Sequence, residues 1–191
     1  MINKNEWKKM RLELQAYDSK REELIKQSRV VLKKSKMLIY AIHRKDTKGI
    51  NSLFKEVKKD KDNLDKVAKL KSNLLNEGSY SAACQEYVEA ATFLEFKKCL
   101  PLSSAKKLGV STSDYLMGLA DLTGELARLA VAGAIKGDYE RVGYIKDFVS
   151  ELWGEMLEFD FRNSALRRKF DSIKYNLNKI EDIRYDIKMR K

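Results

Sequence analysis

Residues 21–44 read REELIKQSRVVLKKSKMLIYAIHR and contain neither proline nor glycine. Apolar or small side chains recur here at intervals of three and four, forming the stripe Leu24, Ser28, Val31, Ser35, Leu38 and Ile42. This spacing places the stripe on one face of an α-helix. Because no proline or glycine occurs from Glu6 to Arg44, the sequence predicts a first helix of up to ~40 residues, a length typical of long-helix bundles.

The remainder of the chain also reads as helices, separated by short breaks at Thr47-Lys48-Gly49, Gly78, Pro101 and Gly137. We expect the later helices at residues 50–76, 80–98, 114–135, 138–158 and 163–188. The charged residues 58–62 should face solvent, and residues 102–109 should form a loop with room for one short turn. No alternation of apolar and polar residues indicates a strand. The sequence therefore predicts an all-α protein, a single-domain bundle over residues 1–191 of about six to seven helices.

All of the excess positive charge lies in the first part of the chain. Residues 1–75 contain 21 Lys and Arg against 10 Asp and Glu, a net of +11, whereas residues 76–191 contain 18 of each. A phosphate backbone is the commonest partner for such a basic surface, and a solvated face without a partner is the alternative. No apolar run reaches the roughly 18 residues that span a bilayer, and residues 1–9 do not resemble a secretory signal. We therefore expect a cytoplasmic protein that does not bind membranes.

Two acidic clusters lie on two different expected helices. Glu86 and Glu89 are three residues apart and share one face of their helix. Asp121 and Glu125 are four residues apart and share one face of theirs. Both pairs sit among apolar residues, and a buried carboxylate requires a counter-charge, a shared proton or a metal ion. The alternative is a solvated acidic edge that pairs with lysines.

The residues around the carboxylates favour a hard divalent cation as their partner. Gly118 and Gly124 flank the second acidic pair and would let another helix or a ligand approach closely. The chain has a single histidine, His43, and lacks the Glu-x-x-His motif of di-iron bundles. All-oxygen ligation suits Mg²⁺ or Mn²⁺, ions that commonly activate a water and neutralise charge on a phosphodiester.

A basic stripe runs along the first helix, roughly 100° around it from the apolar stripe. It consists of Lys26, Arg29, Lys33, Lys36, Tyr40 and His43, with Arg44 beside it. Cations at this spacing can follow nucleic-acid phosphates, while Tyr40 or His43 can stack on a base or donate a hydrogen bond. Taken alone, such a stripe is more often a solvated face that binds nothing.

Several motifs resemble the translin and translin-associated factor X family, and the translin-associated factor X members in particular. They are REELIKQSR at residues 21–29, QEYVEA at 85–90, DYLMGLADLTGELAR at 114–128 and RKFDSIKYNL at 168–177. The resemblance extends over nearly the whole chain from about residue 20. The chain departs from the family pattern in the short loop at 99–112 and in Ser113, where a proline often precedes the Asp-Tyr-Leu motif.

The resemblance implies an all-α bundle that assembles into a closed oligomeric shell, a homo-octamer around nucleic acid. It also implies an Mg²⁺-dependent or Mn²⁺-dependent endoribonuclease that cuts single-stranded RNA. The catalytic carboxylates and metal ligands then fall on Glu86, Glu89 and Asp121, with Glu125 in the same site as a further ligand or as the group that orients a bound water. Because translin itself is chiefly a binder, a non-catalytic protein that binds single-stranded RNA or DNA is the alternative. A helical scaffold whose acidic clusters pair with a neighbouring subunit is a second alternative.

Overall fold

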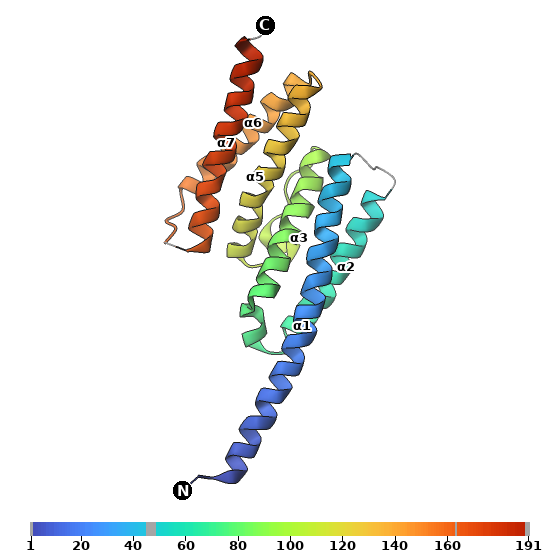
Figure 1. The fold of residues 1–191 in the computed structure, drawn as a ribbon, viewed down its shortest axis with the longest axis vertical. Helices are drawn as coiled ribbons and strands as arrows, with labels where there is room; N and C mark the ends of the chain where they lie inside the picture. The colour runs from blue at the N-terminus through green and yellow to red at the C-terminus, as the bar shows by residue number, and fades with distance from the viewer. Residues whose placement is uncertain (1, 45–48, 163, 190–191) are drawn as a thin grey trace.

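The computed structural model describes residues 2–44, 49–162 and 164–189, and these residues are almost entirely helical, without a strand. In chain order the elements are α1 Lys4–Arg44, α2 Ile50–Ala68, the 3₁₀ helix η1 Ser72–Asn76, α3 Gly78–Lys97, α4 Ala105–Leu108, α5 Thr112–Ile135, α6 Tyr139–Leu157 and α7 Ala165–Met189 (Figure 1). The predicted all-α class is confirmed, and so is the long N-terminal helix. No helix in the described ranges is both long enough and apolar enough to cross a membrane.

Helices α3 and α5 form the centre of the bundle. α3 packs against α1, α2 and α5, and α5 packs in turn against α6 and α7. Figure 1 shows α1 and α2 on one side of this central pair and α6 and α7 on the other. α3 is buried on most of its faces between Tyr80 and Phe96. Apolar residues all around a helix are expected where that helix lies at the centre of a core.

The two central helices approach each other closely at Gly118 of α5. A β-carbon at this position would lie 2.7 Å from the Cβ of Val88 and 2.8 Å from the carbonyl oxygen of Gln85, both on α3. Atoms in folded proteins do not approach so closely, so only glycine permits this helix separation. A β-carbon at Gly124 would meet only the amide nitrogen of Asn176, at an ordinary 3.7 Å. The contact at Gly118 brings the acidic clusters of the two helices side by side.

Helix α1 buries the predicted apolar stripe along its second half, against α2 and α3. Near the edge of the bundle, the Tyr17 hydroxyl donates a hydrogen bond to Oε1 of Glu77 at 2.7 Å. The Arg21 Nε atom donates to the same oxygen at 2.9 Å. Residues 4–16 project past the bundle and are exposed on every face (Figure 1). The N-terminal part of the helix therefore lies outside the core that fixes the rest of it.

The second predicted helix is shorter than expected, and one prediction about its surface is wrong. α2 ends at Ala68, and residues 72–76 form η1 instead of its last turns. The sequence predicts that residues 58–62 face solvent, but Lys61 is buried. Its Nζ atom lies 2.6 and 2.8 Å from the carboxylate oxygens of Asp65 and 3.3 Å from the carbonyl oxygen of Gly109. Asp65, one turn later, balances the charge of the lysine, and this pairing makes its burial tolerable.

The remaining helix boundaries follow the predicted breaks with small differences. Ser111 is the N-cap of α5, and its hydroxyl accepts a hydrogen bond from the Asp114 backbone N–H at 3.1 Å. The segment predicted as a loop at 102–109 contains the short helix α4. Residues 47 and 48 of the first predicted break, and residue 163 at the predicted start of the last helix, lie outside the described residues.

Candidate functional site

The four predicted carboxylates meet where α3 passes α5. Glu86 and Glu89 lie one turn apart on α3. Asp121 and Glu125 lie one turn apart on α5. A pocket of about 350 Å³ opens beside them and is lined by Lys36, Ile39, Tyr40, Glu86, Glu89, Glu125 and Arg128. The structure therefore brings carboxylates from both acidic clusters and part of the basic stripe of α1 to the same hollow.

Glu89 is the most enclosed of the four carboxylates, with 8% of its surface exposed. Burial raises the pKa of Glu89 to about 8, and the three other carboxylates shift it in the same direction. Within the described residues, no basic side chain forms an ion pair with Glu89. Because an unpaired buried charge is costly, this group holds a proton or requires a nearby cation at neutral pH.

Two of the other carboxylates face lysines from neighbouring helices. The Nζ atom of Lys36 on α1 lies 3.3 Å from Oε1 of Glu86. Lys169 on α7 donates a hydrogen bond to Asp121. Burial raises the pKa of Glu86, and the charge of Lys36 opposes this shift without cancelling it. Both lysines therefore reduce, but do not remove, the excess of negative charge at the site.

Glu125 is held by two basic side chains. The Nε2 atom of His43 lies 2.5 Å from Oε2 of Glu125, and Nη1 of Arg128 lies 2.9 Å from the same oxygen. Burial by itself would raise the pKa of Glu125, but the hydrogen bond to His43 and the charge of Arg128 outweigh it and lower the pKa. The His43 ring also packs against Phe93, with centroids 4.9 Å apart. The i, i+3 spacing of Glu125 and Arg128 could have revealed that pair from the sequence.

The basic stripe is exposed along α1 except at one position. Its solvent-facing members are Lys26, Arg29, Lys33, Lys36, Tyr40 and Arg44. The side chain of His43 is only 15% exposed and is directed to Glu125 instead. The Arg44 guanidinium lies over the Tyr40 ring, 5.6 Å from its centroid. Because Lys36 and Tyr40 also line the pocket, the stripe leads to the mouth of the carboxylate site.

Comparison with known proteins confirms the resemblance seen in the motifs. The Translin family matches residues 19–191 of the chain. The chain belongs to the translin family. The Translin-associated protein X homolog of Schizosaccharomyces pombe is 29% identical over 190 residues, covering 90% of this chain and 82% of that protein. An uncharacterized protein of Methanocaldococcus jannaschii is 34% identical over 164 residues, covering 81% of this chain and 70% of that one.

The similarity to translin itself covers a shorter segment. Translin of Gallus gallus is 42% identical over 77 residues, which is 40% of this chain and 34% of that translin. The match thus spans about a third of the length of this relative. The similarity to the translin-associated protein X homolog of the same family extends over most of both chains.

Solved structures of translin-like fold superpose on nearly the whole molecule. The crystal structure of apo-NeC3PO has a TM-score of 0.85 at 28% identity, covering 94% of this chain and 95% of that one. AfC3PO has a TM-score of 0.87 at 22% identity, covering 97% and 98% of the two chains. A complex of AfC3PO with duplex RNA has a TM-score of 0.82 at 22% identity. These structures confirm the predicted helical architecture of a translin-family protein.

Two residues of this translin-family site, Lys169 and Gln85, are not found by the sequence analysis. Lys169 binds Asp121, and its Nζ atom also donates to Oε1 of Gln85 at 3.0 Å. The Gln85 amide in turn donates to the Ser81 hydroxyl at 2.8 Å and to Oδ1 of Asp114 at 3.0 Å. Both residues lie within family motifs, but only the packing of α7 against α5 shows that the lysine reaches a carboxylate.

The carboxylates offer the donor atoms that a hard divalent cation prefers. Buried Glu89, surrounded by like charges, has the counter-charge requirement that such a cation would satisfy. In the described part of the chain, however, no three His, Cys, Asp or Glu side chains are already grouped to hold a metal ion. Lys36 and Lys169 hold two of the carboxylates in ion pairs. The donor set therefore fits Mg²⁺ or Mn²⁺, and the lysines would have to release their carboxylates first.

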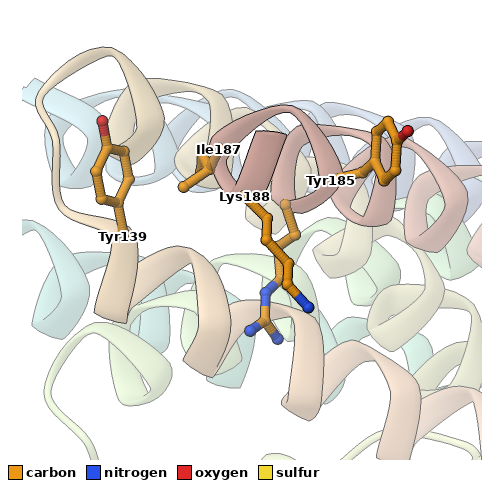
Figure 2. Close-up of a pocket in the computed structure, with 5 residues that line it drawn as sticks. Tyr139, Tyr185, Ile187 and Lys188 are labelled. Carbon is orange, nitrogen blue, oxygen red and sulfur yellow. The ribbon is translucent and has the colours of Figure 1, made fainter. Parts of the chain in front are cut away.

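A second hollow of the translin-like bundle lies between the start of α6 and the C-terminal part of α7. Figure 2 shows Tyr139 on α6 and Tyr185, Ile187 and Lys188 on α7 around it, and Arg184 completes the lining. None of these lining residues is acidic, so this hollow does not offer the donors that a hard divalent cation requires.

Proposed function

We propose that this protein is an Mg²⁺-dependent endoribonuclease that cuts single-stranded RNA inside an oligomeric helical shell. The observation that carries the proposal is Glu89, a buried carboxylate whose pKa is raised to about 8 by burial and by three acidic neighbours. Carboxylates perturbed in this way cluster at functional sites. Membership of the translin family and the similarity to the translin-associated protein X homolog support the same function.

In this proposal the basic stripe of α1 holds the RNA backbone. Lys26, Arg29 and Lys33 are exposed at intervals of three or four residues and neutralise successive phosphates. Tyr40 is exposed at the rim of the pocket and stacks on an unpaired base. Lys36, which belongs to both the stripe and the pocket, reaches the phosphate that lies beside the carboxylates.

In this proposal the carboxylates would hold the divalent cation. Mg²⁺ or Mn²⁺ bound there would lower the pKa of a water and neutralise charge on the scissile phosphate. Glu86, Glu89 and Asp121 would be the ligands. Glu125 remains ionised because its two basic partners lower its pKa, and it would either ligate the cation or orient a bound water. His43 would act through Glu125, since its ring is directed to that carboxylate and away from the exposed stripe.

The preference for single-stranded RNA follows from the chemistry of the stripe. AfC3PO, a protein of the same fold, has been solved with duplex RNA. In a duplex the bases are stacked and paired, so the exposed Tyr40 ring can stack only on a base that is free of such pairing. Single-stranded DNA offers the same phosphates and base faces and would be bound by the same contacts. The closed homo-octamer follows from the family resemblance.

The test is cleavage of a labelled single-stranded RNA by the purified protein in Mg²⁺, Mn²⁺ or EDTA. Glu89→Gln keeps the size of the side chain and removes its charge. We expect it to slow cleavage at least ~100-fold, beyond the losses typical of residues that only support metal ligands. Glu181→Gln, on the exposed face of α7, is the matched control. Cleavage in EDTA, or equal cleavage by the Glu89 variant, would refute the proposal.

A non-catalytic protein that binds single-stranded RNA or DNA is the second candidate. The ion pairs favour it, because Glu86 and Asp121 already have lysine partners and no group of three metal-ligating side chains occurs among the described residues. This function predicts RNA affinity that falls steeply with salt and does not depend on a divalent ion. Tight binding without cleavage in any metal would establish it.

A further inference from the structure

The apolar periodicity of α1 continues beyond the part of the helix that packs against the bundle. Trp7, Met10, Leu14, Tyr17 and Arg21 precede the buried stripe at the same alternating intervals of three and four residues. Tyr17 still packs against the core. We define the N-terminal extension as residues 4–16, which are exposed on every face and project past the bundle in Figure 1.

This exposed apolar face needs a partner. Isolated helices shorter than about 12–15 residues are marginal in water, so the extension gains little stability by itself. Trp7 is 52% exposed, and Met10 and Leu14 follow it on the same face. Large apolar side chains that line up on one exposed face mark an interaction surface. The extension therefore presents an apolar helix face on which no other part of the described chain packs.

The charge of the extension limits what can cover that face. It carries four basic residues against two acidic ones, namely Lys4, Lys8, Lys9 and Arg11 against Glu6 and Glu13. Two extensions paired with each other would place like charges side by side, which opposes association. An acidic surface with its own exposed apolar side chains is the complement.

The end of α6 provides such a surface. We define the acidic segment as residues 151–160, which hold Glu151, Glu155, Glu158 and Asp160 and no Lys or Arg. Within the described residues, all four are exposed and none forms an ion pair. Leu157 and Phe159, each about half exposed, add apolar surface. In Figure 1 the end of α6 lies far from the start of α1, so a straight α1 cannot reach the acidic segment of its own chain.

We propose that the N-terminal extension of one copy docks on the acidic segment of a second copy of this chain. The proposal rests on the oligomeric shell of the proposed function. Each copy contributes one extension and offers one acidic segment, so all contacts are completed either in a two-fold pair that exchanges extensions or in a closed ring. The apolar face of the extension packs on Leu157 and Phe159, while Lys8 and Arg11 face Glu155 and Glu158.

The test uses the full chain and measures its mass in solution by light scattering over a range of concentrations. Lys8→Glu/Arg11→Glu reverses charge on the extension and should raise the concentration needed for assembly at least ~10-fold, because like charges then meet. Lys58→Glu/Lys59→Glu makes the same charge change on the exposed face of α2 and should leave the mass unchanged. Circular dichroism confirms that each variant keeps its helices. An unchanged mass for the extension variant overturns the proposal.

A rescue experiment identifies the docking surface. The variant Glu155→Lys/Glu158→Lys, which makes the acidic segment basic, should impair assembly. Combining it with Lys8→Glu/Arg11→Glu should restore assembly, because the extension is then acidic and the segment on α6 is basic. If the extension variant dissociates but the α6 variant does not, the extension docks elsewhere and the proposal is wrong. If the extension variant keeps its mass but loses RNA affinity, the extension is an RNA-binding arm, and the proposal is also wrong.

Cleavage of single-stranded RNA, measured on the same samples, separates this proposal from the proposed function. A wild-type chain that assembles through these surfaces but does not cut RNA supports the docking and removes the nuclease function. A wild-type chain that cuts RNA as a monomer overturns the docking and the oligomeric shell, and leaves only the metal-dependent cleavage in place.

Discussion

Helix α2 and the α3–α5 site both enclose charged side chains, but they balance the charge differently. Lys61 on α2 is 1% exposed and faces Asp65 one turn later, with Nζ 2.6 Å from the nearest carboxylate oxygen. The carbonyl oxygen of Gly109 accepts a further hydrogen bond from the lysine. The α3–α5 site instead gathers four carboxylates. Among the described residues, its most buried member, Glu89, has no ion-pair partner.

The difference separates a structural charge pair from a site that is suited to bind a cation. A matched buried pair is tolerated only while both partners are present. An excess of buried negative charge destabilises the fold until a proton or a cation arrives, and such destabilisation is typical of functional sites. Neutral substitutions should therefore have opposite effects on stability in the two regions.

The largest change in stability is expected for Lys61→Met. Asp65 would be left mostly buried without a counter-charge, and the free energy of unfolding should fall by about 3–5 kcal/mol. Urea denaturation measures the loss, with Lys58→Met on the exposed face of the same helix as the control. Adding Asp65→Asn to Lys61→Met should recover most of the stability. A double variant as unstable as the single one would contradict the explanation by charge.

In EDTA, Glu89→Gln should make the protein more stable. The pKa of Glu89 is about 8 in the folded chain against an ordinary value of 4.5. Protonated Glu89 therefore contributes stability that is complete below pH 4.5, falls as the pH rises from 4.5, and is lost once the pH has risen through about 8. Glutamine does not undergo this loss, so the variant should gain about 3 kcal/mol at neutral pH and almost nothing near pH 4. Thermal denaturation across this pH range measures the gain, and an equal gain at both ends would contradict the prediction.

Lys169→Met should strengthen the binding of a divalent ion. The lysine now occupies Asp121, so a cation must compete with it for that carboxylate. We expect Mn²⁺ affinity to rise about tenfold, equivalent to roughly 1.4 kcal/mol. Titration calorimetry measures the change, and Lys174→Met on the exposed face of α7 is the control. Affinity that is unchanged or weaker would show that Lys169 does not compete at this position.

The smallest effect is expected where the charge is fully solvated, on the exposed stripe of α1. Lys33→Ala should weaken RNA binding only a few-fold, and the slope of log affinity against log salt should decrease by about one. Fluorescence anisotropy at several salt concentrations measures both quantities, and Lys179→Ala on α7 is the control. Identical slopes for wild type and Lys33→Ala would indicate that this lysine does not contact a phosphate.

Periodicity in the sequence was sufficient to predict the long helices and the buried face of α1. The stripe from Leu24 to Ile42 is buried as predicted, because its spacing matches the turn of the helix. The meeting of the acidic clusters was also predictable, since Gly118 indicated a close approach beside Asp121. Both signals can be read along a single helix.

The errors and omissions concern contacts between distant segments. Lys61 stands in a run of charged residues that reads as solvent-exposed, and its burial depends on Gly109, which packs near it only in the folded chain. Lys169 reaches Asp121 because α7 packs on α5. His43 belongs to the basic stripe by spacing, yet it lies at the edge where α1 meets α5 and binds Glu125. Spacing along one helix does not reveal the partner that another helix supplies.

The contact between Gly118 and Val88 also fixes how far the acidic pair of α3 stands from that of α5. Oxygen ligands lie about 2.0–2.1 Å from Mg²⁺ and about 2.3–2.6 Å from Ca²⁺. A change of a few tenths of an ångström in helix separation is therefore enough to favour one ionic radius over another. Because a methyl group at position 118 would force such a change, the ion selectivity of the proposed metal site would depend on the absence of a side chain at Gly118.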